Sequence, residues 1–173
     1  LTRYDDFIFL ADTGGVVDDL PVFAFTQRDA ELRGVEAELF APIARVGRGE
    51  LDLRVFGDYV AGKLDDGERL PRLPPLRYGA RLQYHDARVL AGLAATRHAA
   101  QDDTAPYETP TAGYTMVDAD FRLRIERTRG MPLDFFVRAT NLRDAEARRH
   151  TSLVKDLAPL PGRNFAIGLR ASW

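Results

Sequence analysis

Alternating apolar and polar residues mark the C-terminal end of this chain. From Phe165 onward every second side chain is apolar, and the alternation runs to the final residue, Trp173. A period of two predicts an extended strand with one apolar face and one polar face. A strand that ends on a large ring fits a transmembrane β-strand, because aromatic rings mark the membrane boundary of outer-membrane barrels. We therefore expect Phe165 and Trp173 to lie at the membrane interface.

Seven further segments are predicted to be extended, and no part of the sequence has helical periodicity. The most regular one covers residues 117–127. It alternates an apolar face with a face of consecutive charged residues, which indicates contact with water. A bulge is expected at Gly34 within a long strand. The other six segments cover residues 3–11, 22–41, 51–61, 77–84, 88–97 and 133–139.

The connections between these segments alternate in length. Short ones are predicted at residues 42–49, 85–87 and 127–132, and long ones at residues 12–21, 64–76, 98–114 and 143–162. Outer-membrane barrels have short periplasmic turns and long outer loops. The sequence thus predicts an all-β fold: an antiparallel transmembrane β-barrel portion of about eight meander strands. A soluble β-sandwich also alternates apolar and polar residues, but it does not explain the aromatic terminus or the loop lengths.

Carboxylates and guanidinium groups share the polar faces of the predicted strands. The pattern is densest where Asp118 and Asp120 precede Arg122 and Arg124. Interleaved opposite charges are typical of a solvated barrel interior, whereas a catalytic pair of carboxylates needs no such row of cations. The charged positions of this kind are Asp52, Arg54, Asp58, Asp118, Asp120, Arg122, Arg124 and Glu126.

Composition excludes several classes of function. The 173 residues include 24 basic and 26 acidic side chains and no cysteine. A net charge of -2 does not suggest a nucleic-acid partner, and the lack of cysteine excludes disulfides and thiolate metal sites. No apolar run approaches the roughly 18 residues of a transmembrane helix. No nucleophile motif, phosphate loop or dinucleotide fingerprint is present, so neither an enzyme nor a bound cofactor is expected.

Four segments resemble sequences of TonB-dependent outer-membrane receptors. Residues 25–38 resemble a strand of that family that carries an acidic residue and a G-x-E sequence before a periplasmic turn. Residues 70–77 resemble its proline-rich approach to a strand, and residues 141–150 its N-L-x-D stretch. Residues 160–165, with the sequence L-P-G-R-N-F, resemble the segment before the terminal strand. The set looks most like the branch of metal and siderophore receptors that includes the zinc receptors.

The resemblance implies an uptake receptor for a metal ion or metal chelate in the outer membrane of a Gram-negative cell. The family's barrel has 22 strands around a plug, so residues 1–173 are expected to be its C-terminal part. The implied partners are outer-membrane lipid, the plug and remaining strands of the same receptor, TonB through an N-terminal segment, and the barrel assembly machinery through the C-terminal strand ending at Trp173.

Candidate ligand-binding residues lie in the predicted outer loops. His98 opens a loop that also contains Asp102, Asp103 and Glu108, and His150 lies in the last loop. Imidazole and carboxylate groups together suit transition metals, so transient capture of a metal by these loops is one hypothesis. No H-x-x-H or H-E-x-x-H spacing is present, and polar loops need no metal. The sequence therefore predicts no metal site of its own.

Two other functions remain open at this point. A complete eight-stranded barrel with a structural or adhesive role is one, because eight strands can close around their side chains. The other is an outer-membrane enzyme, for which His150 and Ser152 are neighbours in sequence. Neighbouring positions do not establish the geometry of a triad, so the enzyme is the weaker alternative.

Overall fold

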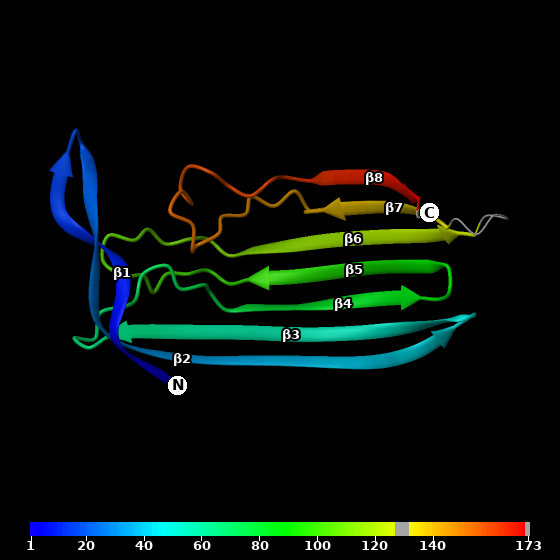
Figure 1. The fold of residues 1–173 in the computed structure, drawn as a ribbon, viewed down its shortest axis with the longest axis horizontal. Helices are drawn as coiled ribbons and strands as arrows, with labels where there is room; N and C mark the ends of the chain where they lie inside the picture. The colour runs from blue at the N-terminus through cyan, green and yellow to red at the C-terminus, as the bar shows by residue number, and fades with distance from the viewer. Residues whose placement is uncertain (127–131, 172–173) are drawn as a thin grey trace.

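The computed structural model describes residues 1–126 and 132–171. They form a single antiparallel sheet whose eight strands lie in chain order (Figure 1). This confirms the predicted all-β meander. The strands are β1 (Thr2–Val17), β2 (Leu20–Val46), β3 (Gly49–Leu64), β4 (Arg77–His85), β5 (Val89–His98), β6 (Tyr114–Ile125), β7 (Leu133–Thr140) and β8 (Asn164–Ala171).

Every second residue of each strand faces the same side of the sheet, and the register joins apolar residues across it. One row crosses seven strands without a polar side chain: Ala41, Leu53, Leu82, Leu93, Ala119, Ala139 and Phe165. We call this side the apolar face. Its large side chains are exposed, including Leu93 at 52% and Ile167 at 71%. The apolar face therefore has no covering layer within the described chain.

The opposite side, which we call the polar face, carries charged residues in pairs. Arg54 lies 2.7 Å from Glu38, Arg77 lies 2.7 Å from Asp58, and Arg81 lies 2.7 Å from Asp120. Each pair joins two strands that are adjacent or nearly adjacent in the sheet. Opposite charges at such cross-strand positions stabilise a sheet by about 0.2–1 kcal/mol each. The predicted interleaving of charges is confirmed for Arg54, Asp58 and Asp120, each of which pairs with an opposite charge on another strand.

The first hairpin corrects the predicted loop at residues 12–21. β1 continues to Val17, which pairs with Leu20 of β2, and only Asp18 and Asp19 form the turn. Both aspartates have positive φ angles, of 50° and 62°. Turns of this kind match the twist of the flanking strands and favour aspartate. The hairpin extends beyond the neighbouring strand ends and turns across the end of the sheet that carries the long loops (Figure 1).

The bulge predicted at Gly34 is also wrong. Gly34 pairs with Val60 in an unbroken register, and the irregularity lies further along β2, between Pro42 and Ala44. Proline has no N–H for the ladder, which explains a bulge at this position. β2 continues after the bulge to Val46, so the connection predicted at residues 42–49 is a turn of only two residues, Gly47 and Arg48.

The short and long connections alternate between the two ends of the sheet, as predicted. Beyond the tight first hairpin, the long ones cover residues 65–76, 99–113 and 141–163, and all leave the same end (Figure 1). The predicted connection at 127–132 lies almost wholly outside the described residues. No helix in residues 1–126 and 132–171 is long and apolar enough to cross a membrane.

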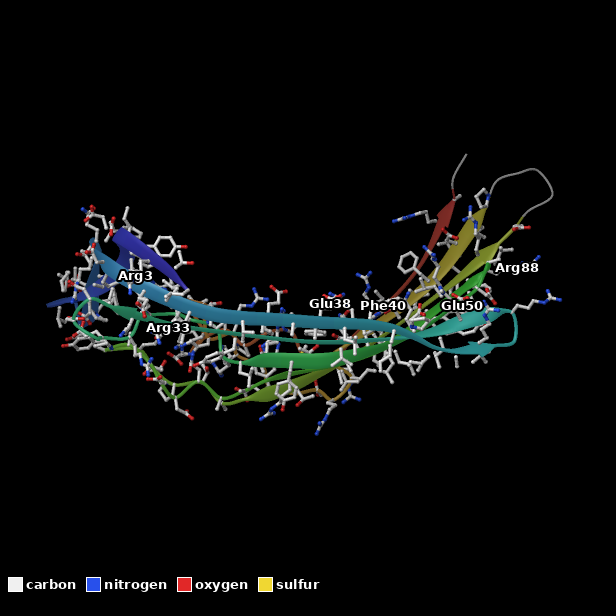
Figure 2. The ribbon with its side chains drawn as sticks, turned by 90° about the horizontal axis from the view of Figure 1, so that it is seen from below. Arg3, Arg33, Glu38, Phe40, Glu50 and Arg88 are labelled. Carbon is white, nitrogen blue, oxygen red and sulfur yellow. The ribbon has the colours of Figure 1, made fainter. Side chains whose placement is uncertain are left out.

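The sheet is open and contains little buried core. β1 and β8 form its two edges, and β8 pairs with β7 as expected. A complete eight-stranded barrel would require β1 to pair with β8. Side chains project from both faces of a thin, curved layer (Figure 2). Within residues 1–126 and 132–171, the buried hydrophobic cluster consists of Ala30, Leu64 and Leu70, against which Phe7 and Phe9 pack.

Candidate functional site

The three long loops are joined by one buried carboxylate, Glu108. Its two oxygens accept hydrogen bonds from the backbone N–H of Arg72, at 3.0 and 3.2 Å, in the loop between β3 and β4. One of them also lies 3.2 Å from Nε2 of His150, in the loop between β7 and β8. Glu108 itself belongs to the loop between β5 and β6, and its side chain is only 9% exposed. A single carboxylate therefore connects all three loops.

Lys155 and Thr111 complete this cluster around His150. Nζ of Lys155 lies 3.5 Å from Glu108, donates to the carbonyl of Thr109 at 2.6 Å, and lies 3.4 Å from Nδ1 of His150. The hydroxyl of Thr111 lies 2.8 Å from the same Nδ1 atom. His150 and Lys155 are 3% and 5% exposed. We call Glu108, Thr111, His150 and Lys155 the loop latch.

Burial lowers the pKa of His150 below its ordinary value, against the opposing effect of the Glu108 carboxylate. The neutral ring suits the geometry, because Nε2–H donates to Glu108 while Nδ1 accepts from Thr111 or Lys155. We assign this tautomer from the hydrogen-bond partners. A proton on Nδ1 would face the ammonium group of Lys155, whose charge also lowers the pKa of His150. The latch therefore holds a neutral histidine between two charged groups.

A second group of contacts closes the loop between β7 and β8. The side-chain amide of Asn141 donates to the carbonyls of Ala145 and Pro161, at 2.9 and 3.3 Å, and its oxygen accepts from the N–H of Ala145 at 2.9 Å. Asp144 accepts a hydrogen bond of 2.8 Å from the backbone N–H of Arg163. The N-L-x-D and P-G-R sequences, 20 residues apart, thus bind each other where the loop begins and ends.

A cavity of about 630 Å³ lies on the polar face beneath these loops. The rings of His98 and Tyr114 stack on one another in its wall, with centroids 4.6 Å apart. Arg77, already paired with Asp58, and Arg149 also line it. Arg149 has no ion-pair partner among residues 1–126 and 132–171. The wall thus combines an aromatic surface with positive charge, an arrangement that suits an anionic or aromatic ligand.

Comparison with known families identifies the family of this chain. Residues 1–142 match the family described as TonB dependent receptor-like, beta-barrel. The chain belongs to the TonB-dependent receptor family. In outer-membrane barrels the polar face of such a sheet lines the lumen, the apolar face contacts lipid and the long loops lie outside the cell.

Solved structures support the same fold for this TonB-dependent receptor chain. The copper transporter OprC matches with a TM-score of 0.76 at 23% identity. The match covers 96% of this chain and 27% of that one, so the chain spans about a quarter of the length of OprC. Comparison with the curated proteins gave no match.

The receptor fold brings together only two of the five candidate ligand residues. Glu108 and His150 meet in the loop latch, where each has protein partners. Asp103 pairs with Arg69 at 2.5 Å, and Asp102 is exposed on the same loop. His98 is not part of the loop latch, but it lines the same cavity as His150. Ligand binding by these residues stays a prediction, and the described residues contain no group of three His, Cys, Asp or Glu that could hold a metal ion.

The structure places one of the two residues expected at the membrane interface. Phe165 lies on the apolar face of β8 and is 61% exposed, and its role at the membrane interface stays a prediction. Trp173 lies outside the described residues. Sequence reasoning missed Thr111, Lys155 and Arg149, because an isolated polar residue in a loop carries no signal of its partners. Asn141 belongs to the N-L-x-D sequence that the resemblance identified. This motif is the one signal from which the complete burial of Asn141 could have been predicted.

Proposed function

We propose that the protein is an outer-membrane receptor that takes up a metal chelate with the help of TonB, and that this chain forms the C-terminal part of its barrel wall. The cavity on the polar face carries the proposal, because it lies in the lumen directly beneath the folded outer loops. A ligand that passes the loops would reach it first. The name of OprC describes it as a copper transporter. This supports uptake of a metal but does not identify which metal.

A chelate fits this wall better than a bare ion. The described residues provide no set of three metal-binding side chains, whereas Arg149, Arg77 and the stacked rings of His98 and Tyr114 offer charge and aromatic contact. Metal-binding small molecules commonly carry carboxylates or phenolates, and guanidinium groups bind such oxygens well. Within this proposal the barrel lies in the outer membrane of a Gram-negative cell, contacts lipid and a plug, and has no catalytic role. Its insertion would depend on the barrel assembly machinery.

Uptake measurements on the complete receptor test the proposal. Cells that lack the receptor are complemented with the wild type, with His98→Ala/Arg149→Glu, or with Arg143→Glu, a control at an exposed arginine of the same loop. Radiolabelled iron(III) citrate, copper(II) and zinc(II) serve as probes. We expect the double variant to lose about tenfold in accumulation of at least one probe, which corresponds to about 1.4 kcal/mol, and the control to resemble the wild type.

Deletion of TonB should abolish the same accumulation. If no probe accumulates in a receptor-dependent way, metal uptake is wrong. If the double variant transports as well as the control, the cavity is not the ligand site.

A further inference from the structure

Basic residues follow the apolar stretch on the lipid side of three strands. Toward the end of the sheet that carries the long loops, the next residue of this face after Val35 of β2 is Arg33. In the same direction, Lys63 comes after Ala61 on β3, and Arg97 comes after Ala95 on β5. All three lie at the end of the sheet that carries the long loops. Arg3 of β1 joins them, because it pairs in register with Glu31 of β2, which itself pairs with Lys63.

The length of the apolar stretch places these residues at the outer membrane boundary. Leu51 to Ala61 spans ten residue steps of roughly 3.3 Å, or about 33 Å along β3. A tilt of about 40° reduces this to a height of about 25 Å, which equals the apolar band of an outer-membrane barrel. Tyr59 and Tyr78 lie on the same face near this end. Lys63 and its neighbours therefore lie where the hydrocarbon ends and the lipid headgroups begin.

Arg3, Arg33 and Lys63 surround one carboxylate, and we call these four residues the outer basic cluster. Glu31 lies 3.3 Å from Nε of Arg3 and 2.5 Å from Nη2 of Arg33. The side chain of Glu31 is 15% exposed, whereas those of Arg3 and Arg33 are 78% and 68% exposed. Figure 2 shows Arg3 and Arg33 at the same end of the sheet, far from Glu50 and Arg88. Three cations and one anion leave two positive charges directed outward.

The opposite boundary of the same face differs. There the hydroxyl of Tyr84 donates to Asp86 at 3.0 Å, and Asp86 is the next residue of this face beyond the strand. If the basic residues only anchored the barrel at the membrane boundaries, they would be expected at both ends of this face. Cations beside an apolar surface attract anionic lipid headgroups. Arginine binds phosphate through two parallel hydrogen bonds. The polarity of the face therefore points to a phosphorylated lipid on the outer side.

We propose that the outer basic cluster binds the phosphate groups of a phosphorylated lipid in the outer leaflet. The inference rests on the proposed location of the receptor in the outer membrane. Arg3 and Arg33 exchange part of their contact with Glu31 for phosphate oxygens, while the acyl chains pack along Val35, Leu39 and Tyr59, which are 65%, 63% and 47% exposed. Glu31 holds the two arginines in place when no lipid is bound.

Lipid binding to the complete purified receptor tests this inference. The variant Arg3→Gln/Arg33→Gln/Lys63→Gln is compared with Arg45→Gln/Arg48→Gln/Arg88→Gln, which removes the same charge at the opposite end. Each protein is titrated with lipopolysaccharide, with phosphatase-treated lipopolysaccharide and with inorganic phosphate. We expect the first variant to bind lipopolysaccharide at least about tenfold more weakly than wild type, because each basic residue near a lipid surface contributes. The control should bind normally.

Three results would overturn the inference: equal binding by the two triple variants, equal binding of phosphatase-treated lipid by the wild type, or equally effective binding of inorganic phosphate. Uptake of the metal probes is measured in the same cells. A receptor that transports normally but loses lipid binding in the first variant supports both proposals. A wild-type receptor that binds the lipid but transports no probe contradicts the proposed cargo alone.

Discussion

At the residue scale, the protonation state of His150 affects how the long loops are held together. Its neutral ring donates to Glu108 and accepts from Thr111 or Lys155. Glu108 and Thr111 belong to the loop between β5 and β6, whereas His150 and Lys155 belong to the loop between β7 and β8. Burial lowers its pKa, so the folded protein binds this proton less readily than the unfolded chain does. Stability from the neutral ring is therefore complete above the unfolded pKa of about 6.5 and decreases as the pH falls below it. Glu108, Lys155 and Asp156 are the charged groups that influence this titration.

We predict that the loop latch opens in acid. Between pH 7.5 and pH 5.5, the hydrogen-exchange protection factors of residues 99–113 and 141–163, which correct for the intrinsic exchange rate at each pH, should decrease in the wild-type receptor. The variant His150→Gln keeps a donor and an acceptor but cannot titrate, so its protection factors should change little over this range. Asp102→Asn, at an exposed carboxylate of the loop that contains Glu108, serves as the control and should behave like the wild type. An equal acid response in His150→Gln would show that another group is responsible.

Sequence reasoning found part of this site for a simple physical reason. His150 and Glu108 were candidates because imidazole and carboxylate groups bind cations, and the structure does bring them together. Their cationic partner is Lys155 of the protein itself. Residues 108 and 155 belong to different loops, and no periodicity relates two loops whose distance depends on the strands between them. Local pattern therefore identifies reactive residue types but not their partners.

At the scale of elements, Asn141 determines how the last outer loop is closed. It is fully buried, and its φ angle of 51° lies in the left-handed region. Asn141→Gly would tolerate this φ angle but lose the three side-chain hydrogen bonds, whereas Asn141→Ala would lose the bonds and add strain of about 1–2 kcal/mol. A buried donor or acceptor left without a partner costs about 1–3 kcal/mol. Local stability of the loop should therefore decrease in the order wild type, glycine variant, alanine variant.

Protease cleavage within residues 145–160 on intact cells measures this order, because cleavage follows local opening of the loop. Leu153→Ala, at a side chain that is 74% exposed, should cleave like the wild type. If the glycine and alanine variants cleave equally fast, backbone strain at Asn141 contributes nothing.

The strands with regular alternation were predictable, and the irregular ones were not. β3, β6 and β8 have long stretches of period-two alternation, and their predicted and observed positions agree closely. In β1 the sequence Asp12-Thr-Gly-Gly breaks the pattern, so it suggested a loop. Pairing with β2 keeps it extended, with a register irregularity between Asp12 and Val16. Cross-strand hydrogen bonds thus override local composition where a long partner strand is available.

For the whole molecule, stability cannot come from a buried interior. The described chain is one curved layer, and its large apolar side chains are mostly exposed. In the proposed outer-membrane receptor these side chains face lipid, so the hydrophobic effect that usually packs a core instead fixes which face of the sheet points outward. The register of strand pairing also fixes which face points outward, because a shift by one residue would exchange the two faces of every strand.

This argument predicts opposite outcomes for adjacent residues of β5. Leu93 lies on the apolar face between Leu82 and Ala119, and Ala94 lies on the polar face between Arg81 and Asp118. Leu93→Arg should destabilise the inserted receptor by about 2–4 kcal/mol, the cost of arginine at the middle of the bilayer. Ala94→Arg introduces the same side chain into a polar, carboxylate-containing surface and should cost far less. Urea unfolding of the receptor in lipid vesicles measures both values, and equal losses would show that the two faces are wrongly assigned.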